Sequence, residues 1–266
     1  MPRRTSRQPP VRAAVPKPDV PPNVPAARNR LGYLAASERP WASLVFLLPF
    51  VLAYEAYALG WIGQPTTPGG TPRHAGNIVA FLLIEQTLAL LGRTARHFPA
   101  FVLVAMLLGA HLWRNDGWRV RPSTVLCMAG EAVGWAVPLV VLGWVSSRYV
   151  QLAAGDHVSL IAKCLGAGIY EELVFRLLGV TVLTVILKDV AGLPNPVAVA
   201  CSLLGSAVLF SSYHYLSPGE QFRPTTFLFR AAAGGYFGLL YALRGFGVTA
   251  GSHAAYDLIV VTCLAT

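Results

Sequence analysis

Hydrophobic residues dominate the chain from Trp41 onward and fall into eight segments separated by short polar stretches. The segments are 41–62, 77–92, 99–113, 124–146, 158–187, 196–216, 227–243 and 247–266. A transmembrane helix needs about 20 mainly apolar residues, with a range of about 17–25. The pattern therefore predicts about eight transmembrane helices, of which the second and third are short enough to be tilted, re-entrant or differently bounded.

The fifth segment stands out for its length and for the charges inside it. Thirty residues at about 1.5 Å each make roughly 45 Å, more than the roughly 30 Å hydrocarbon core requires. We expect this helix to tilt strongly or to break, most naturally at Gly166 and Gly168. Ionisable residues at such depth, here Glu171, Glu172 and Arg176, are functional-site candidates. On a helix Glu172 and Arg176 lie on one face and can pair, whereas Glu171 points about 100° away.

Composition supports the membrane assignment. The chain is 55% hydrophobic and 12% charged, with a mean hydropathy of +0.53, whereas a soluble domain carries about a quarter charged residues. The predicted fold class is all-α, a polytopic membrane protein with about eight transmembrane helices around a polar intramembrane cavity. The four cysteines lie far apart in apolar segments, where they are expected to pack as small hydrophobic residues; they are Cys127, Cys164, Cys201 and Cys263.

Residues 1–40 differ from the rest of the chain. They contain nine prolines, eight Lys or Arg and two acidic residues, and so carry +6 of the net charge of +9. We expect a disordered basic cytoplasmic tail here, followed by a transmembrane domain at 41–266. The tail is not a signal peptide, because no apolar run follows its early arginines before residue 41. Its charge predicts an anionic lipid surface as a partner, and no pattern typical of nucleic-acid binding is found.

Loop charges predict the orientation in the membrane. With eight spans and a cytoplasmic N-terminus, the tail joins five further basic residues inside: Arg93, Arg96, Arg148, Arg223 and Arg230. Six basic residues then lie outside: Arg73, Arg114, Arg119, Arg121, Lys188 and Arg244. We therefore expect both ends of the chain in the cytoplasm. The basic, Ala-, Arg- and Pro-rich composition favours a bacterial source, and hence the inner (plasma) membrane.

Two histidines lie inside predicted spans. His214 ends the stretch Phe210-Ser-Ser-Tyr-His214, and His253 comes one turn before Asp257 on the same helix face. With Glu171, Glu172 and Arg176, these residues form the candidate site. The other histidines fall in loops or near span ends, where a solvated imidazole is expected: His74, His97, His111 and His157.

Two carboxylates and two imidazoles in a low-dielectric cavity suit hydrolysis. Burial favours the neutral form of a carboxyl group and a neighbouring arginine favours the charged form, so two glutamates can differ in protonation. One could act as general base on a water shared with an imidazole, while the second imidazole and a polar neighbour donate to an oxyanion. The same groups are also plausible zinc ligands. Two alternatives therefore stay open: a site without cofactors, and a site that holds a divalent metal at Glu171, His214 and His253.

Three motifs, in order, resemble those of the CPBP family, which comprises the type II CAAX prenyl endopeptidases and the bacteriocin-processing, Abi-type membrane proteases. Glu171-Glu-Leu-Val-Phe-Arg176 matches E-E-x-x-x-R, Phe210-Ser-Ser-Tyr-His214 matches F-x-x-x-H, and His253-Ala-Ala-Tyr-Asp257 resembles H-x-x-x-N. The resemblance covers a protease-like core at about 158–266. It implies a glutamate-dependent intramembrane endopeptidase of about eight helices around a polar cavity, in which Glu171 activates water with His214.

The resemblance also implies that Glu172 and Arg176 hold the charge balance, and that His253 and the residue at position 257 stabilise the oxyanion. Asp257 replaces the commoner Asn. An amide can donate to an oxyanion and an ionised carboxylate repels it, so Asp257 is protonated, orients His253 or supports a metal. On the predicted spans His214 falls at the cytoplasmic end of its helix, whereas the other groups lie at mid-bilayer depth.

The predicted function is cleavage of a peptide bond in a membrane-associated peptide or protein. Its substrate is a lipidated C-terminus, a leader peptide or a membrane-anchored sorting tag, and a bacterial source makes a prenylated one less expected. The alternative is a non-enzymatic transporter, immunity or scaffold protein that uses the same polar cavity. A transporter would depend on the single carboxylates Glu55, Glu85 and Glu131 in the other spans, although such groups more often bond to a neighbouring helix.

Overall fold

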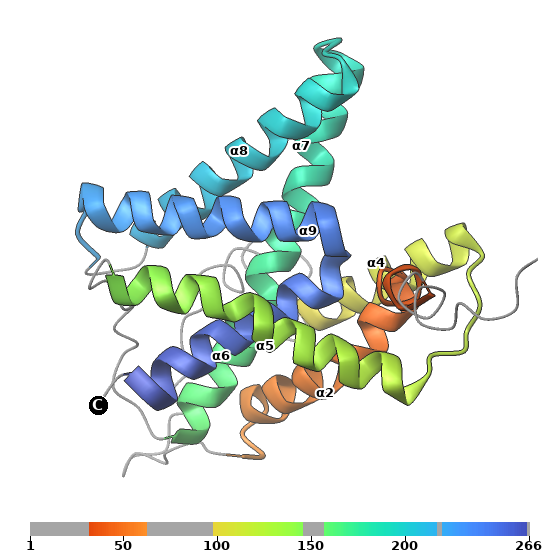
Figure 1. Cartoon of the computed structure of the whole chain (residues 1–266), viewed down its shortest axis with the longest axis vertical. Coiled ribbons are helices and arrows are strands. Elements are labelled where there is room, and N and C mark those ends of the chain that lie inside the picture. The colour runs from red at the N-terminus through yellow and green to blue at the C-terminus, as the bar shows by residue number, and fades with distance from the viewer. Residues whose placement is uncertain (1–31, 63–97, 146–156, 217–219, 265–266) are drawn as a thin grey trace, which may run out of the picture.

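The structure, a computed structural model, describes residues 32–62, 98–145, 157–216 and 220–264, and every regular element in these ranges is helical (Figure 1). The α-helices are α2 (Pro40–Ala58), α4 (Phe98–Arg114), α5 (Pro122–Val145), α6 (His157–Glu172), α7 (Thr181–Val185), α8 (Asn195–Tyr213) and α9 (Pro224–Ile259). Three π-helical segments, η3 (Leu173–Val180), η4 (Ile186–Val190) and η6 (Val260–Leu264), and one 3-10 turn, η5 (His214–Leu216), extend them. The predicted all-α class is confirmed for this part of the chain.

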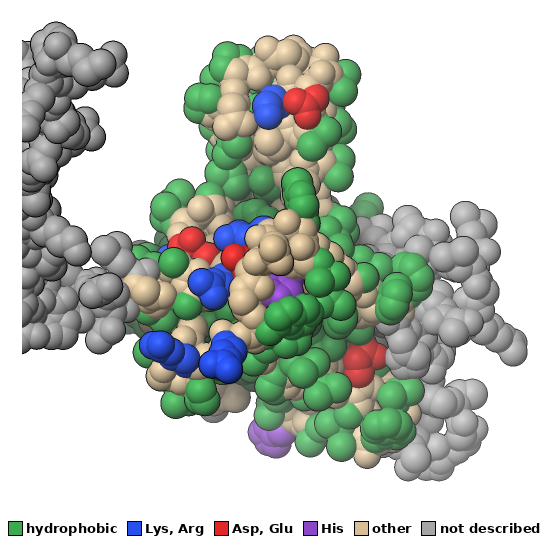
Figure 2. Space-filling view, turned by 90° about the vertical axis from the view of Figure 1, so that its right-hand side faces the viewer, with side chains coloured by type: hydrophobic (Ala, Val, Ile, Leu, Met, Phe, Trp, Pro, Cys, Tyr) green, Lys and Arg blue, Asp and Glu red, His purple; other side chains and the backbone are tan. Residues whose placement is uncertain are grey.

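Helices suited to a bilayer make up much of the described chain. Four are long and apolar enough to cross a membrane: Pro40–Ala58, Pro122–Trp144, Asn195–Leu216 and Pro224–Cys263. Figure 2 shows apolar side chains over much of the face that it views, and large side chains such as Phe101, Leu126 and Leu204 are about two-thirds exposed or more. Such a surface suits lipid. The predicted segment 77–92 lies outside the described residues, so the number of eight spans is not established here.

The helix α9 changes direction at Gly245. Its backbone there has φ 73° and ψ −178°, a left-handed conformation that glycine adopts freely and other residues resist. Figure 1 shows the chain turning back at this point, so that two arms form a V. We name 224–244 the first arm and 246–259 the second arm. The separate segments predicted at 227–243 and 247–266 correspond to these two arms.

The fifth predicted segment is one helical run from α6 to η4. The break expected at Gly166 and Gly168 is wrong, because α6 continues through both glycines to Glu172. The helix instead widens immediately after Glu172, where η3 has π-helical hydrogen bonding. Such segments inside α-helices are frequent at functional sites. The widened turn carries Arg176.

The start of α2, the end of α4 and the 115–121 connection meet at one end of the bundle. Trp41 Nε1 donates to the carbonyl oxygen of Trp118 over 2.7 Å, and the ring of His111 packs against both indoles. The orientation predicted from the loop charges places this connection on the opposite side of the membrane from the N-terminal segment. Its three arginines are Arg114, Arg119 and Arg121. The contact instead brings the start of α2 and this connection to the same end of the helices.

Residues 32–37 are helical and pack on the bundle, although the predicted disordered tail extends to residue 40. The hydroxyl group of Tyr33 donates to Glu131 of α5, and Ser37 and Glu38 accept hydrogen bonds from Arg244 of α9. The packed part of the described chain therefore begins before residue 41. The rest of the predicted tail, 1–31, lies outside the described residues.

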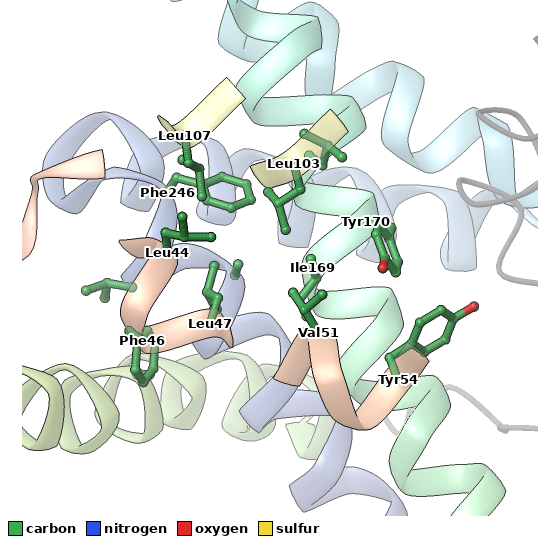
Figure 3. Close-up of a cluster of buried hydrophobic side chains, with 14 of the residues drawn as sticks. Leu44, Phe46, Leu47, Val51, Tyr54, Leu103, Leu107, Ile169, Tyr170 and Phe246 are labelled. Atoms are coloured by element: carbon green, nitrogen blue, oxygen red, sulfur yellow. The ribbon is translucent and has the colours of Figure 1, made fainter. Parts of the chain in front are cut away.

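The hydrophobic core joins α2, α4, α6 and the second arm of α9 (Figure 3). Its labelled members are Leu44, Phe46, Leu47, Val51, Tyr54, Leu103, Leu107, Ile169, Tyr170 and Phe246. Between membrane helices, close packing rather than escape from water drives association. Because Ile169 and Tyr170 immediately precede Glu171, this core fixes the end of α6, where the candidate site begins.

Candidate active site

A buried row of charged groups lies between α6 and α9. Glu172 Oε2 is 3.0 Å from Arg176 Nε, and both side chains are fully buried. Glu172 Oε1 lies 2.7 Å from Nδ1 of His253. A carboxylate can only accept a hydrogen bond, so this contact assigns the Nδ1 proton to His253 and fixes the orientation of the ring. The pairing expected from the spacing of Glu172 and Arg176 is present.

Glu171 and Asp257 approach the other nitrogen of the same ring. Glu171 Oε2 is 3.8 Å and Asp257 Oδ2 is 3.7 Å from Nε2 of His253. Both distances exceed a direct hydrogen bond. The hydroxyl group of Tyr213 interacts with the Glu171 carboxyl group from α8. His253 therefore stands among three carboxyl groups, and only the one from Glu172 is bonded to it directly.

Aromatic rings enclose this cluster. Phe237 stacks on His253, with 4.6 Å between the centroids and 18° between the planes. Phe210 lies under the guanidinium of Arg176 at 4.6 Å, and its ring also contacts His253 at 6.0 Å. These faces stabilise a buried cation. They also surround the charges with apolar matter, in which electrostatic interactions are stronger than in water.

One glycine allows α6 and α9 to meet closely enough for these contacts. A Cβ atom on Gly168 would lie 2.5 Å from the backbone nitrogen of Ala254 and 2.7 Å from its Cβ. Small residues permit such approach between membrane helices. Ala254 follows His253, and Gly168 precedes Glu171 and Glu172 by about one turn. The sequence therefore places the closest backbone contact directly beside the charged row.

α8 is held against the site in a similar way. A Cβ atom on Gly234 would lie 3.1 Å from Cα of Ala207. The carbonyl oxygen of Gly234 accepts a hydrogen bond of 2.9 Å from Arg176 Nη2, and Ser206 Oγ donates to the carbonyl of Phe175 over 2.6 Å. The first arm of α9 thus positions both a helix and the buried guanidinium.

His214 stands at the end of α8 and is half-buried. Its Nδ1 lies 2.7 Å from the carbonyl oxygen of Phe210. Because that oxygen can only accept, Nδ1 donates, and Nε2 is the nitrogen left for chemistry. The Phe210 ring contacts His214 at 5.0 Å as well as His253, and the Tyr213 ring lies 4.2 Å from His214. Among the described residues no hydrogen bond joins His214 to Glu171, so these two rings connect it to the cluster.

The arrangement of the described side chains also bears on the metal alternative. Within the described ranges no group of three or more His, Cys, Asp or Glu side chains is arranged to hold a metal ion. The site as built is a network of acid, base and arginine side chains that contact one another.

Two of the single carboxylates in other spans bond to neighbouring helices. Glu55 of α2 accepts a hydrogen bond of 2.8 Å from the Tyr170 hydroxyl of α6. Glu131 of α5 is paired with Arg244 of α9. Both contacts agree with the expectation that such carboxyl groups bond to a neighbouring helix. Glu85 lies outside the described residues.

Sequence reasoning missed several residues that complete the site. Tyr213 faces Glu171, and Phe237 covers His253 from the first arm of α9. Tyr213 lies inside the quoted motif, so a search for polar residues beside each catalytic candidate would have found it. Phe237 carries no such signal, because an aromatic residue in an apolar helix is unremarkable until the fold brings it to the histidine.

A carboxyl group beside an imidazole, with the far imidazole nitrogen bonded to a second carboxylate, is an arrangement that can support hydrolysis, here between apolar helices. Residues 153–259 match the family model described as "Type II CAAX prenyl endopeptidase Rce1-like". The match covers less than half of the chain, and it contains every catalytic residue predicted from the motifs. It confirms the resemblance to the CPBP family over this segment, and the four long apolar helices agree with an integral membrane protein. No curated protein and no solved structure matches the chain.

Proposed function

We propose that this protein is a glutamate-dependent intramembrane endopeptidase that cleaves a membrane-associated peptide or protein. The observation that carries the proposal is the position of Glu171, whose carboxyl group is 3.8 Å from His253 Nε2 without a direct hydrogen bond. Polar groups at such a separation are commonly bridged by water. A water held there contacts both a base and a donor.

In the proposed reaction Glu171 removes a proton from that water, and the hydroxide attacks the carbonyl carbon of the scissile bond. His214 assists through Nε2, because its Nδ1 is occupied by the Phe210 carbonyl. The oxyanion of the tetrahedral intermediate accepts hydrogen bonds from His253 and the Tyr213 hydroxyl. Glu171 then gives the proton to the departing amide nitrogen, which breaks the C–N bond.

Glu172, Arg176 and Asp257 act on His253 in this scheme. Glu172 accepts the hydrogen bond from Nδ1 of His253, and Arg176 lies 3.0 Å from the same carboxylate as its buried counter-ion. Of the three roles considered for Asp257, orientation of His253 fits its 3.7 Å approach to Nε2 best. The half-buried Asp257 carboxyl group then limits rotation of the ring and leaves the oxyanion to neutral and cationic donors.

We further propose that the N-terminal segment faces the cytoplasm, in the inner membrane of a bacterium. Because Trp41 contacts Trp118, Arg39 and the arginines of the 114–121 region lie at the same end of the helices, and the sequence before residue 32 is rich in Lys and Arg. Under the positive-inside rule this end is cytoplasmic, and anionic lipid is the expected partner of the tail. In Figure 2 basic side chains gather on one part of an otherwise largely apolar face.

The test compares peptide termini in membranes from cells with the wild-type chain and with Glu171→Gln. New termini that vanish in the variant identify the substrate and the cleaved bond. His214→Ala should have the same effect, whereas Glu55→Gln, an equal change at a carboxyl group bonded to Tyr170, should leave the termini unchanged. Identical termini in wild type, Glu171→Gln and His214→Ala, with all three folded, would sink the proposal.

The two rival functions have their own readouts. Cleavage that stops on chelation and returns only with added divalent metal would favour a metal-dependent hydrolase using Glu171, His214 and His253. Ion-coupled uptake lost in Glu55→Gln or Glu131→Gln would favour a transporter. Both carboxyl groups are bonded to neighbouring helices, which argues against such a role.

A further inference from the structure

A second ion cluster, built around a buried arginine, lies at the turn of α9, outside the proposed reaction. Arg244 immediately precedes Gly245 and is only 6% exposed. Its Nε and Nη2 donate to the two carboxyl oxygens of Glu131 in α5. Nη1 donates to Glu38 over 2.9 Å, and Nη2 also donates to Ser37 over 2.8 Å. We call Arg244, Glu131, Glu38 and Ser37 the Arg244 cluster.

The Arg244 cluster needs an explanation because charge between apolar helices is costly. Every guanidinium nitrogen of Arg244 donates to a named partner, and the contact with Glu131 is bidentate, the strongest geometry for such a pair. A cluster so fully bonded offers no free group for chemistry. Its effect is to hold three separate parts of the chain together at one point.

That point controls the active site because α9 contributes to it from both arms. The first arm supplies the Gly234 carbonyl that binds Arg176 and the Phe237 ring that stacks on His253. The second arm supplies His253 itself. The angle between the arms therefore sets the stacking of Phe237 on His253 and the 2.7 Å contact between His253 and Glu172.

Other contacts support the turn together with the Arg244 cluster. The backbone N–H of Gly247 donates to Ser43 Oγ over 3.1 Å, and Thr249 Oγ1 donates to the Gly245 carbonyl over 2.9 Å. Eight residues at about 1.5 Å each place His253 about 12 Å along the second arm, so a rotation of about 10° at the turn moves it by about 2 Å. A shift of that size breaks its bond to Glu172.

We propose that Arg244 is a positioning residue of the active site, which acts through the α9 turn to hold His253 against Glu172. The inference rests on the proposed function for its kinetic consequence, and on geometry alone for the position of the second arm. It also makes Ser37 and Glu38 part of the catalytic domain rather than of the tail.

The experiment measures the arm angle and the reaction separately. Spin labels on Leu239→Cys in the first arm and on the native, exposed Cys263 report the distance between the arms, in a chain whose exposed Cys127 and Cys201 are serine. Cleavage is followed on the membrane peptide identified by the Glu171→Gln comparison. The matched control is Arg114→Gln, which removes an arginine from an exposed ion pair with Asp116 at 3.0 Å.

We expect Arg244→Gln to broaden the distance distribution and to lower kcat about 10²-fold with little change in KM, since a 1 Å misplacement has that effect. Arg244→Lys keeps the charge but loses the bidentate contact. It should restore part of the narrow distance distribution and part of kcat. Arg114→Gln should change neither. If Arg244→Gln does not fold, Glu38→Gln, which loses a single contact, is expected to show the same two changes at smaller size.

An unchanged distance distribution in Arg244→Gln, or in Glu38→Gln where the first does not fold, overturns the proposal. So does a broadened distribution with an unchanged kcat. A broadened distribution in a protein whose wild type cleaves nothing overturns the proposed function instead, and leaves the Arg244 cluster as the device that sets the arm angle.

Discussion

In the described part of the chain, Arg244 and Arg176 are both buried and each is paired with carboxyl groups, but the two clusters differ in how completely their groups are bonded. At the turn of α9, Arg244 donates from all three of its nitrogens. In the active site, Arg176 lies 3.0 Å from Glu172 without the alignment of a hydrogen bond, and its Nη1 has no hydrogen-bond partner in the described part of the chain.

This difference separates a structural cluster from a reactive one. Saturated hydrogen bonds lower the free energy of one arrangement and leave nothing for a substrate. Around His253 the gaps of 3.7 and 3.8 Å to Asp257 and Glu171 leave room for a change of partners during a reaction. Incomplete bonding, rather than charge alone, marks the site.

The largest expected effect comes from breaking the reactive cluster. Arg176→Leu leaves Glu172 buried without its counter-ion, and the free energy of unfolding should fall by about 3–5 kcal/mol with complete loss of cleavage. The double variant Glu172→Leu/Arg176→Leu should regain most of that stability and no cleavage, because apolar side chains of similar size can replace a buried pair. Denaturant unfolding in detergent micelles and the cleavage assay measure the two quantities. Activity in the double variant would contradict our assignment of the pair.

The next effect tests the close approach beside the reactive cluster. A Cβ atom on Gly168 would lie 2.5 Å from the Ala254 backbone, so Gly168→Ala must push α6 from α9 and should lower cleavage about 10²-fold. Gly235→Ala makes the same change in α9 where no atom lies within 4 Å. That control should keep full activity and unfold at an equal or higher denaturant concentration. Equal loss in both variants would mean that helix packing is not what the glycine serves.

A smaller effect is expected for the hydroxyl group of Tyr213. Tyr213→Phe keeps the ring contacts with Phe175 and His214 and removes only the group that faces Glu171. Hydrogen bonds to charged groups contribute about 1.5–3 kcal/mol, so kcat should fall roughly 10- to 100-fold while unfolding changes little. A fall in stability without a fall in kcat would assign the hydroxyl to packing.

The smallest effect is expected at Asp257. Asp257→Asn introduces the residue commoner in the resembling motif and removes a carboxyl group that makes no direct hydrogen bond to His253. The cleavage rate should change by less than about tenfold, the size of one ordinary hydrogen bond. Asp257→Leu, which cannot orient the ring, should lose more. A large and equal loss in both variants would mean that a negative charge is required at this position.

Local spacing and motif order predicted which side chains of the candidate site lie together around His253. Glu172 and Arg176 pair because they lie four residues apart on one helix, and the 253–257 spacing puts His253 and Asp257 on one face. The same signals could not place His214, whose link to the cluster depends on the Phe210 ring. They also missed the π-helical turn after Glu172, because hydrophobic period alone does not distinguish it from an α-helix.

Contacts between distant parts of the chain were the harder part to predict. Glu131 and Arg244 are 113 positions apart, and Arg244 alone suggested only a charge in a loop. The loop assignment of Arg114, Arg119 and Arg121 depended on counting crossings along the chain. A single contact between Trp41 and Trp118 bears on it, since it joins two helix ends directly.

The turn at Gly245 also constrains how the protein is made. Glu172 and His253 are 81 positions apart, and at about 5–20 residues per second the ribosome needs roughly 4–16 s to synthesise that interval. During this time Glu172 and Arg176 can already neutralise each other within one helix. The second arm of α9 follows the first and pairs with it as a hairpin. Under the proposed function, a nascent chain therefore carries Glu171 and Glu172 before His253 is made, and the candidate site is incomplete until the hairpin closes.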